Sequence, residues 1–231
     1  MLSLVIPAFN ESENLKKNIP KLVEHLNSEK KKYEIIISED GSTDNTYGVL
    51  KALSKKYGLR FIHGPRRLGK GGALKRASLL VRGDRIIFMD ADMPASLDSL
   101  DIMERELEKN DIVIGSRYTE GSKTSRAFRR YVLSRLYHLL VRMIFPELKF
   151  SDVKCGFKGF RKNAFISVNK MTKENGWNWD LEFLLRARKM GFRIKEIPVE
   201  WKERRHSKVN LLKESFLQIF DILKIRLRVL F

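Results

Sequence analysis

Cysteine and long apolar runs are what this sequence has least of. Its single cysteine, Cys155, excludes an internal disulfide and fits a reducing compartment. No segment reaches the roughly 18 uninterrupted apolar residues that a membrane span needs. The apolar residues 2–6 are too few for a secretory signal and are followed at once by polar sequence. We therefore expect neither a signal peptide nor a transmembrane helix.

Negative charge is also in short supply. The chain holds 46 Lys and Arg against 28 Asp and Glu, which gives a formal net charge of +18. Such an excess indicates an anionic partner, and nucleic acid, an anionic membrane surface or a phosphorylated substrate would each serve. With 231 residues, 43% of them hydrophobic, the chain can bury a full core, which excludes a disordered protein. The sequence contains no internal repeat and no linker, so we expect one domain over residues 1–231.

Short apolar runs alternate with amphipathic segments in the first half of the chain. The predicted strands are residues 2–7, 33–38, 59–63, 85–89 and 111–116. The predicted helices are residues 12–26, 44–57 and 69–81. Ser12 is the expected N-cap of the first helix, and Thr43 or Asp44 that of the second. This alternation implies right-handed βαβ units and an α/β fold with a mostly parallel sheet.

The second half of the chain is less regular. Residues 122–130 are polar and basic and predict a mobile loop. Helices are predicted at residues 131–145, 177–190 and 209–231, a turn and strand at 153–161, and a further strand at 194–201.

Acidic residues follow three of the predicted strands. Asp90 and Asp92 come directly after the buried strand 85–89, while Glu11 and Asp40 follow two other strands. The carboxyl ends of parallel strands form one edge of the sheet, where ligands bind in open α/β folds. A strand end with a capping aspartate would explain one such residue, but several carboxylates together are costly unless they bind something. A nucleotide diphosphate with a divalent cation fits, with Asp92 on the metal and Asp40 and Glu11 accepting from base or ribose hydroxyls.

The glycine-rich segment 64–71 nearly matches a phosphate-binding P-loop. That motif requires Ser or Thr after its lysine, and Gly71 stands there instead, so the sequence excludes a P-loop NTPase. No Gly-x-Gly-x-x-Gly follows the first strand, which excludes the dinucleotide fingerprint. What remains is a helix start that carries Lys70 and suits an anion, with a plain tight turn as the alternative.

Several motifs, taken in order, resemble the signature of family 2 glycosyltransferases with a GT-A fold. They are Val5-Ile-Pro-Ala-Phe-Asn-Glu11, Glu39-Asp-Gly-Ser-Thr-Asp44, Asp90-Ala-Asp92 and Gly115-Ser-Arg117. Others narrow the resemblance to the dolichyl-phosphate β-glucosyltransferases, with the polyprenyl-phosphate mannose synthases close behind: Leu68-Gly-Lys-Gly-Gly-Ala73, Cys155-Gly-Phe-Lys158, Trp179-Asp-Leu-Glu182, and Trp201 followed by Ser207-Lys208. The resemblance implies a GT-A, Rossmann-like sheet flanked by helices and covers nearly the whole chain.

The resemblance also assigns roles to residues of this chain. It implies donor contacts at Pro7, Phe9, Glu11, Asp40, Asp90 and Asp92, with Mg²⁺ or Mn²⁺ on Asp90 and Asp92. We also expect Lys70, at the glycine-rich helix start, to bind the donor. The resemblance implies acceptor contacts at Arg117, Arg130, Ser134, Arg204 and Lys208. Residues 1–120 would then form a nucleotide-sugar-binding half and residues 121–231 an acceptor-binding half.

The chain departs from the family pattern at a few positions. The mannose synthases commonly carry a metal-binding glutamine two positions after the second aspartate, where this chain has Met93-Pro94. This difference weakens the mannose interpretation and leaves the third protein ligand of the metal open. Phe9 stands where tyrosine is common, Glu39 stands where aspartate is common, and the transmembrane helices of the synthases are missing.

The implied reaction is inverting transfer of a hexose, with UDP-glucose favoured, to dolichyl or another polyprenyl phosphate. Asp92, Asp180, Arg117 and Arg130 are the candidate catalytic residues. A phosphate acceptor has a second pKa of about 6, so it is ionised at neutral pH and needs little help from a base. A sugar hydroxyl would need a base, and Asp180 is the candidate, with a helix N-cap as its equally weighted alternative. A GDP-mannose-dependent synthase and a transferase acting on a sugar hydroxyl therefore stay open.

Two rivals belong to other classes, a nucleic-acid-binding module and a nucleotidyltransferase. Against the first, the basic residues interleave with apolar stripes in helices 131–145 and 209–231 rather than with stacking aromatics. Release of pyrophosphate would identify the second. Core packing would explain either apolar stripe alone. Two such stripes on a strongly basic chain favour binding to a membrane surface. We expect a monotopic enzyme at the cytoplasmic face that binds no nucleic acid, and the sequence gives no indication of protein partners.

Overall fold

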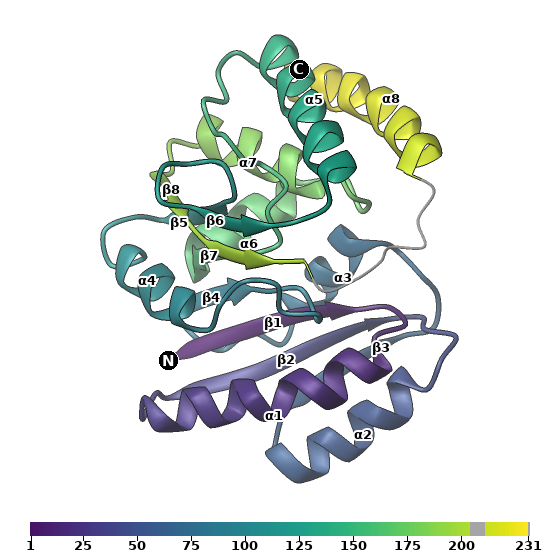
Figure 1. The fold of residues 1–231 in the computed structure, drawn as a ribbon, viewed down its shortest axis with the longest axis vertical. Coiled ribbons are helices and arrows are strands. Elements are labelled where there is room, and N and C mark those ends of the chain that lie inside the picture. Colours follow the sequence, from purple (N-terminus) through teal and green to yellow (C-terminus); the bar gives the residue numbers. More distant parts are fainter. Residues whose placement is uncertain (204–210, 231) are drawn as a thin grey trace.

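The central element is a seven-stranded, mostly parallel sheet (Figure 1). The structure, a computed structural model, describes residues 1–203 and 211–230. In order across the sheet the strands are β3 (Arg60–Gly64), β2 (Tyr33–Asp40), β1 (Leu2–Ala8), β4 (Arg85–Phe88), β7 (Lys158–Arg161), β5 (Ile112–Ser116) and β8 (Ile194–Pro198). Only β7 runs antiparallel to its two neighbours, β4 and β5. The α/β class and the mostly parallel sheet are therefore confirmed.

Helices cover both faces of this sheet. One face packs against α1 (Ser12–Ser28), α2 (Thr46–Tyr57) and α4 (Asp98–Glu106), and the other against α3 (Lys70–Ala77), α5 (Phe128–Ile144), α6 (Lys162–Met171), α7 (Trp179–Lys189) and α8 (Leu211–Leu230). Successive side chains of a strand point to opposite faces. Leu4 and Ile6 of β1 accordingly lie in the first core, whereas Val5 lies in the second.

A second, two-stranded sheet joins β6 (Lys123–Ser125) to β9 (Glu200–Lys202). Strand β9 is also tied to the loop that follows the paired aspartates. Ala95 and Trp201 form an antiparallel bridge, and the Lys202 amide donates to the Pro94 carbonyl oxygen at 2.8 Å. This attachment brings the end of β9 beside the carboxyl end of β4.

Most element boundaries agree with the sequence prediction to within a few residues, with some corrections. The segment 122–130, expected to be a loop, contains β6 and the start of α5. Glu11 holds the N-cap position of α1, and Ser12 is its first helical residue. The predicted strand 194–201 is two strands, β8 and β9, in different sheets, and the predicted helix 69–81 ends at Ala77. Helices α4 and α6 were not predicted.

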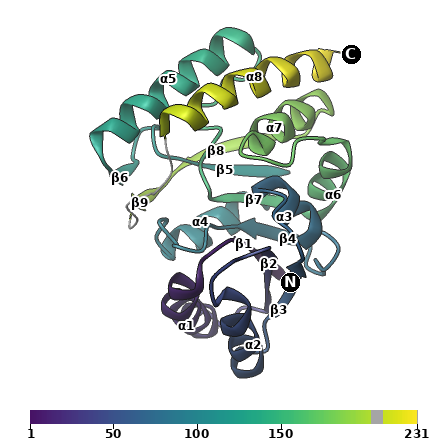
Figure 2. The same cartoon turned by 90° about the vertical axis from the view of Figure 1, so that its right-hand side faces the viewer.

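Helices α5 and α8 lie side by side at one end of the molecule (Figures 1 and 2). Helix α5 buries His138 and Val141, and the described part of α8 buries Ile222, Ile225 and Val229. Apolar side chains also cover their outer faces: Phe128, Leu136, Leu139 and Met143 on α5, and Phe220, Leu223 and Leu227 on α8. Within the described ranges, no helix is long and apolar enough to cross a membrane.

Candidate active site

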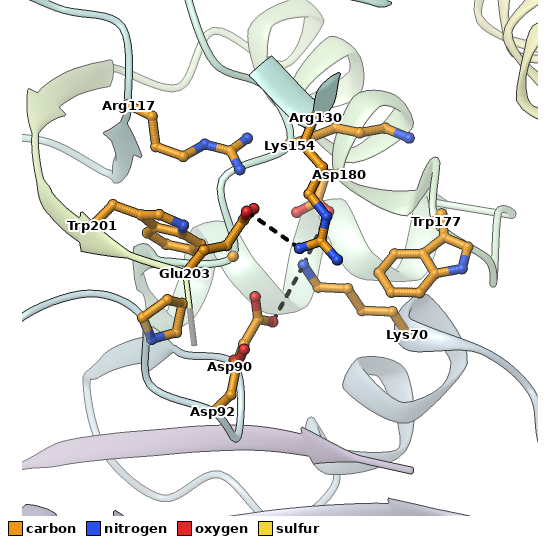
Figure 3. Close-up of a pocket in the computed structure, with 12 residues that line it drawn as sticks. Lys70, Asp90, Asp92, Arg117, Arg130, Lys154, Trp177, Asp180, Trp201 and Glu203 are labelled. Carbon is orange, nitrogen blue, oxygen red and sulfur yellow. Dashed lines mark hydrogen bonds and ion pairs between the residues drawn. The ribbon is translucent and has the colours of Figure 1, made fainter. Parts of the chain in front are cut away.

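A cavity of about 250 Å³ lies where β4 and β9 end (Figure 3). Carboxylates from the β4 end form its lower wall in this view, and basic side chains from the second half of the chain form the opposite wall. Its lining residues are Lys70, Asp90, Asp92, Pro94, Arg117, Arg130, Lys154, Gly156, Trp177, Asp180, Trp201 and Glu203. Six of the predicted site residues therefore meet here, namely Lys70, Asp90, Asp92, Arg117, Arg130 and Asp180.

The paired aspartates sit on a tight turn directly after β4. The Met93 amide donates to the Asp90 carbonyl oxygen at 2.9 Å, and Met93 takes a left-handed φ of 44°. The Asp90 carboxylate lies so close to Gly156 that a Cβ on this glycine would stand 1.8 Å from Asp90 Oδ2. Residue 156 must therefore be glycine for Asp90 to keep this position.

The residues at this turn fit a divalent cation only in part. Asp90 and Asp92 line the same cavity, and Asp90 is partly exposed to it. Among the described residues, no group of three His, Cys, Asp or Glu side chains could hold a metal ion. Mg²⁺ is commonly bound by one or two carboxylates together with substrate phosphates and water, so two carboxylates suit a metal that arrives with a diphosphate.

Asp180 is buried between two lysines. Its Oδ1 lies 2.7 Å from Lys158 Nζ, and its Oδ2 lies 3.3 Å from Lys70 Nζ. Burial alone would raise the pKa of the Asp180 carboxyl, but the two ammonium groups outweigh it and the pKa is lowered. Lys158, almost fully buried, also donates to the Cys155 carbonyl oxygen. Asp180 is thus held ionised by charge.

The structure excludes the helix N-cap alternative for Asp180. Asn178 holds the N-cap position of α7, and Asp180 is the second residue of that helix. Lys70 is the first residue of α3 and extends from Asp180 toward Asp90. Its Nζ lies 3.9 Å from Asp90 Oδ1. Burial disfavours the charge of Lys70, but Asp180 and Asp90 outweigh it and raise its pKa. Lys70 therefore places a fixed positive charge beside the aspartate turn.

Arg117 is fixed by a buried partner that the sequence did not reveal. Its Nε lies 2.6 Å from Asp152 Oδ2, and a second nitrogen donates to Oδ1 at 2.8 Å. The planar guanidinium matches a carboxylate in this two-point geometry. Burial would raise the pKa of Asp152, but Arg117 outweighs it and the pKa is lowered. The Cζ atom of Arg117 lies 5.2 Å from the centre of the Trp201 ring.

Arg130 and Glu203 form the upper wall of the cavity. Arg130 Nη1 lies 3.3 Å from Glu203 Oε2, and Arg126 Nη2 donates to Glu203 Oε1 at 3.3 Å. Ser134, one turn further along α5, does not line this cavity, and its carbonyl oxygen accepts from His138 Nδ1 at 2.6 Å. Arg204 and Lys208 lie outside the described residues.

The remaining predicted donor residues lie at the ends of β1 and β2. Both Asp40 oxygens accept backbone hydrogen bonds, from the Leu68 amide at 3.0 Å and the Gly69 amide at 2.8 Å. The Glu11 carboxylate accepts from Asn14 Nδ2 at 2.5 Å. Arg67 lies 4.0 Å above the centre of the Phe9 ring, and Pro7 is the second-last residue of β1. Asp40 therefore orders the 65–69 loop as well as standing where a nucleoside is expected.

Sequence reasoning missed several lining or supporting residues, namely Asp152, Lys154, Lys158, Trp177 and Glu203. Lys158 and Trp201 stand in motifs that carry the family resemblance, but those motifs assigned them no role. A lysine inside the aromatic segment 157–160 was a signal for Lys158, because a lysine in a buried strand needs a carboxylate partner. Asp152 and Glu203 stand in polar segments and gave no such signal.

Comparison with known proteins identifies the family of the chain. Residues 3–168 match the family model described as glycosyl transferase family 2. The chain therefore belongs to this family of glycosyltransferases.

Among individual relatives, the chain is similar to glycosyltransferase AglD of Haloferax volcanii, with 34% identity over 92% of this chain. The chain spans only 35% of the length of that protein. It is also similar to the dolichyl-phosphate beta-glucosyltransferase of Saccharomyces cerevisiae, with 32% identity over 99% of this chain and 75% of that protein. The corresponding human enzyme is 32% identical over 99% of this chain and 76% of its own length.

A solved structure confirms the fold. Glucosyl-3-phosphoglycerate synthase from Mycobacterium tuberculosis, in complex with UDP, superposes with a TM-score of 0.73. The superposition covers 98% of this chain and 79% of that one, at 19% sequence identity. This similarity extends across the whole sheet and both helical layers.

Proposed function

We propose that this chain transfers glucose from UDP-glucose to dolichyl or another polyprenyl phosphate, inverting the anomeric carbon. The observation that carries the proposal is one cavity with a carboxylate pair on one wall and Arg117, Arg130 and Lys154 on the other. The names of the eukaryotic relatives support glucose and dolichyl phosphate.

The carboxylate wall suits the donor. Asp90 and Asp92 would hold Mg²⁺ or Mn²⁺, which when bound compensates the charge of the departing nucleoside diphosphate. Structures of the mycobacterial synthase hold Mn²⁺ with UDP-glucose, which supports a divalent ion in this fold. Lys70 lies beside Asp90 and adds a fixed positive charge for the diphosphate. Pro7, Phe9, Glu11 and Asp40 would contact the nucleoside.

The basic wall suits an acceptor phosphate. Arg130 and Lys154 line it, and Arg117 is oriented by Asp152. A phosphate monoester is an ionised nucleophile at neutral pH and needs no base. Asp180 is held by two ammonium groups, which makes it a poor proton acceptor. This observation favours a phosphate acceptor over a sugar hydroxyl, and it makes Asp180 a residue that positions Lys70.

The outer faces of α5 and α8 suit a membrane surface. Leu136, Leu139 and Met143 are each more than half exposed on α5, and Leu227 is 62% exposed on α8. Exposed apolar stripes on a chain with a net charge of +18 are typical of helices that lie in the interface of an anionic membrane. We infer a peripheral protein at the cytoplasmic face, which receives the lipid phosphate near α5.

A donor panel tests the proposed reaction. The purified chain is incubated with short- or long-chain polyprenyl phosphate, Mg²⁺ or Mn²⁺, and UDP-glucose or GDP-mannose, and the lipid product is identified by mass. We expect a hexosyl phosphate lipid with UDP-glucose and release of UDP. If product forms only with GDP-mannose, the transferred sugar is mannose and not glucose. Release of pyrophosphate would contradict a glycosyltransferase reaction. Transfer only to sugar hydroxyls would contradict the phosphate acceptor.

A further inference from the structure

An acidic side chain stands on the basic wall of the cavity. Glu203 lies at the end of β9 with its side chain 17% exposed, and its two oxygens each lie 3.3 Å from a different guanidinium, those of Arg126 and Arg130. A carboxylate between two guanidiniums uses the same donors and geometry that a phosphate uses. Glu203 therefore occupies a place that suits an incoming anion.

The arginines around Glu203 differ in how firmly they are held. Arg117 forms a hydrogen-bonded ion pair with the buried Asp152, and Arg126 also donates to the Tyr118 hydroxyl at 2.7 Å. Arg130 lines the cavity and is paired with Glu203. A phosphate that enters the cavity must therefore compete with Glu203 for Arg130.

Trp201, two residues before Glu203, provides an independent indication of a ligand. Trp201 lies in β9 and Glu203 directly follows that strand, and both line the cavity. The Trp201 side chain is 5% exposed, and its Nε1 has no hydrogen-bond partner among the described residues. A buried N–H donor without a partner is costly, so a ligand oxygen in the cavity would relieve it. Phosphate has enough oxygens to satisfy both this donor and Arg130.

We propose that Glu203 is an internal anion in the acceptor-phosphate site, and that an incoming phosphate monoester displaces it from Arg130 and accepts from Trp201 Nε1. This inference rests on the proposed phosphate acceptor. It adds a threshold for binding, because every incoming anion must displace the same carboxylate. A dianionic monoester interacts more strongly with the basic wall and so exceeds this cost by more than a monoanionic diester or carboxylate does.

Binding without donor tests this threshold. The affinity of citronellyl phosphate, a short isoprenyl monoester, and of its monoanionic methyl diester is measured by calorimetry for wild type, Glu203→Gln and Glu200→Gln. Glutamine keeps the size of Glu203 and its ability to accept from arginine, but it removes the competing charge. Glu200 is the matched control, because it lies on the same strand and pairs with Lys202 at 3.3 Å, away from the cavity.

We expect Glu203→Gln to bind the monoester roughly three- to ten-fold more tightly, since two partly exposed ion pairs no longer compete. The diester should gain by a similar factor, because it displaces the same carboxylate, and Glu200→Gln should behave as wild type. Unchanged or weaker monoester binding by Glu203→Gln would overturn the inference, because a merely structural or catalytic Glu203 predicts that result.

The indole signals provide a second measurement. The chain has three tryptophans, so ¹⁵N-indole labelling gives three N–H resonances, which Trp177→Phe and Trp201→Phe assign. Citronellyl phosphate should move the Trp201 resonance downfield, whereas UDP-glucose alone should not. A shift with UDP-glucose alone, or none with the monoester, would contradict the assignment. Wild type that binds the monoester but never glucosylates it would instead contradict the proposed function and leave the displacement intact.

Discussion

At the scale of single residues, the site depends on charges that hold one another in place. Asp180 fixes Lys70 and Lys158, and Asp152 fixes Arg117. Each of these carboxylates is nearly fully buried, so its ionised form is stable only because a cation contacts it. The groups that we propose to meet substrate are therefore positioned before substrate arrives, which is what electrostatic catalysis requires.

The metal role predicts a specific loss at Asp92. Replacing Asp92 by Asn should lower the transfer rate by about a hundredfold or more, since a lost metal ligand costs several kcal/mol at the transition state. The thermal unfolding midpoint should change little, because this strand-end carboxylate belongs to the cavity wall and not to either core. Steady-state kinetics and calorimetry check both parts. Full activity of the variant, or of wild type in EDTA, would contradict the metal role.

Gly156 predicts a loss of a different kind. In Gly156→Ala the new Cβ would overlap Asp90 Oδ2, so the carboxylate must leave its place. We expect a higher requirement for Mn²⁺ and a reduced rate in a metal titration. Gly58→Ala is the control, because φ is +66° there and a Cβ meets nothing within 4 Å. The Gly58→Ala substitution should lower the free energy of unfolding by about 1 kcal/mol and leave the metal requirement unchanged. Equal metal requirements in both variants would show that Asp90 tolerates displacement.

Asp152 predicts how acid affects stability. Its pKa is lower in the folded protein than in the unfolded chain, so its contribution is complete above the unfolded value of about 3.9 and disappears as the pH falls through the folded value. The free energy of unfolding of wild type, measured in urea, should therefore fall below about pH 4. Asp152→Asn should be less stable at neutral pH and show a shallower acid slope. Parallel slopes would contradict the assignment.

At the scale of elements, the sequence predicted the strands of the large sheet because most of them contain a local apolar run, but it missed β6 and merged β8 with β9. The aspartate turn after β4 was also predictable, since it follows a buried strand directly. The ion-pair partners of the site residues could not be predicted, because they come from distant segments of the chain. Lys70 and Asp180 are 110 residues apart, and Arg117 and Asp152 are 35 residues apart. Helices α4 and α6 were missed, although Leu100 and Met103 of α4 and its C-cap residue Leu107 have helical spacing and lie in the core.

Helix α5 predicts membrane binding that is separable from folding. Leu136→Glu with Met143→Glu places charges on side chains that are 56% and 65% exposed, so the fold should tolerate them. Flotation with anionic liposomes should fall severalfold, because burying charge in the interface is unfavourable. Ile102→Glu on α4, also partly exposed, should float as wild type does. Undiminished flotation of the double variant would mean that α5 faces water.

At the scale of the whole molecule, the excess of positive charge predicts salt-dependent association. Each basic residue near an anionic surface contributes about 1 kcal/mol, and the attraction is screened over roughly 8–10 Å at physiological salt. Flotation should therefore decrease with salt but stop short of complete release, because the apolar faces of α5 and α8 do not depend on ionic strength. Complete release at high salt would mean that charge alone holds the protein. A protein that stays in solution beside anionic liposomes at low salt would contradict membrane binding altogether.

The antiparallel strand β7 has a consequence for how the chain must be made. Among the described strands, β5 pairs only with β7 and β8, and β7 joins it to β4. When only residues 1–150 of the nascent chain have emerged from the ribosome, β4 and β5 therefore have unpaired edges. Such edges can pair with other chains. The sheet can close only after residue 161 has emerged, so β5 waits for a strand that is made after it before it can join β4.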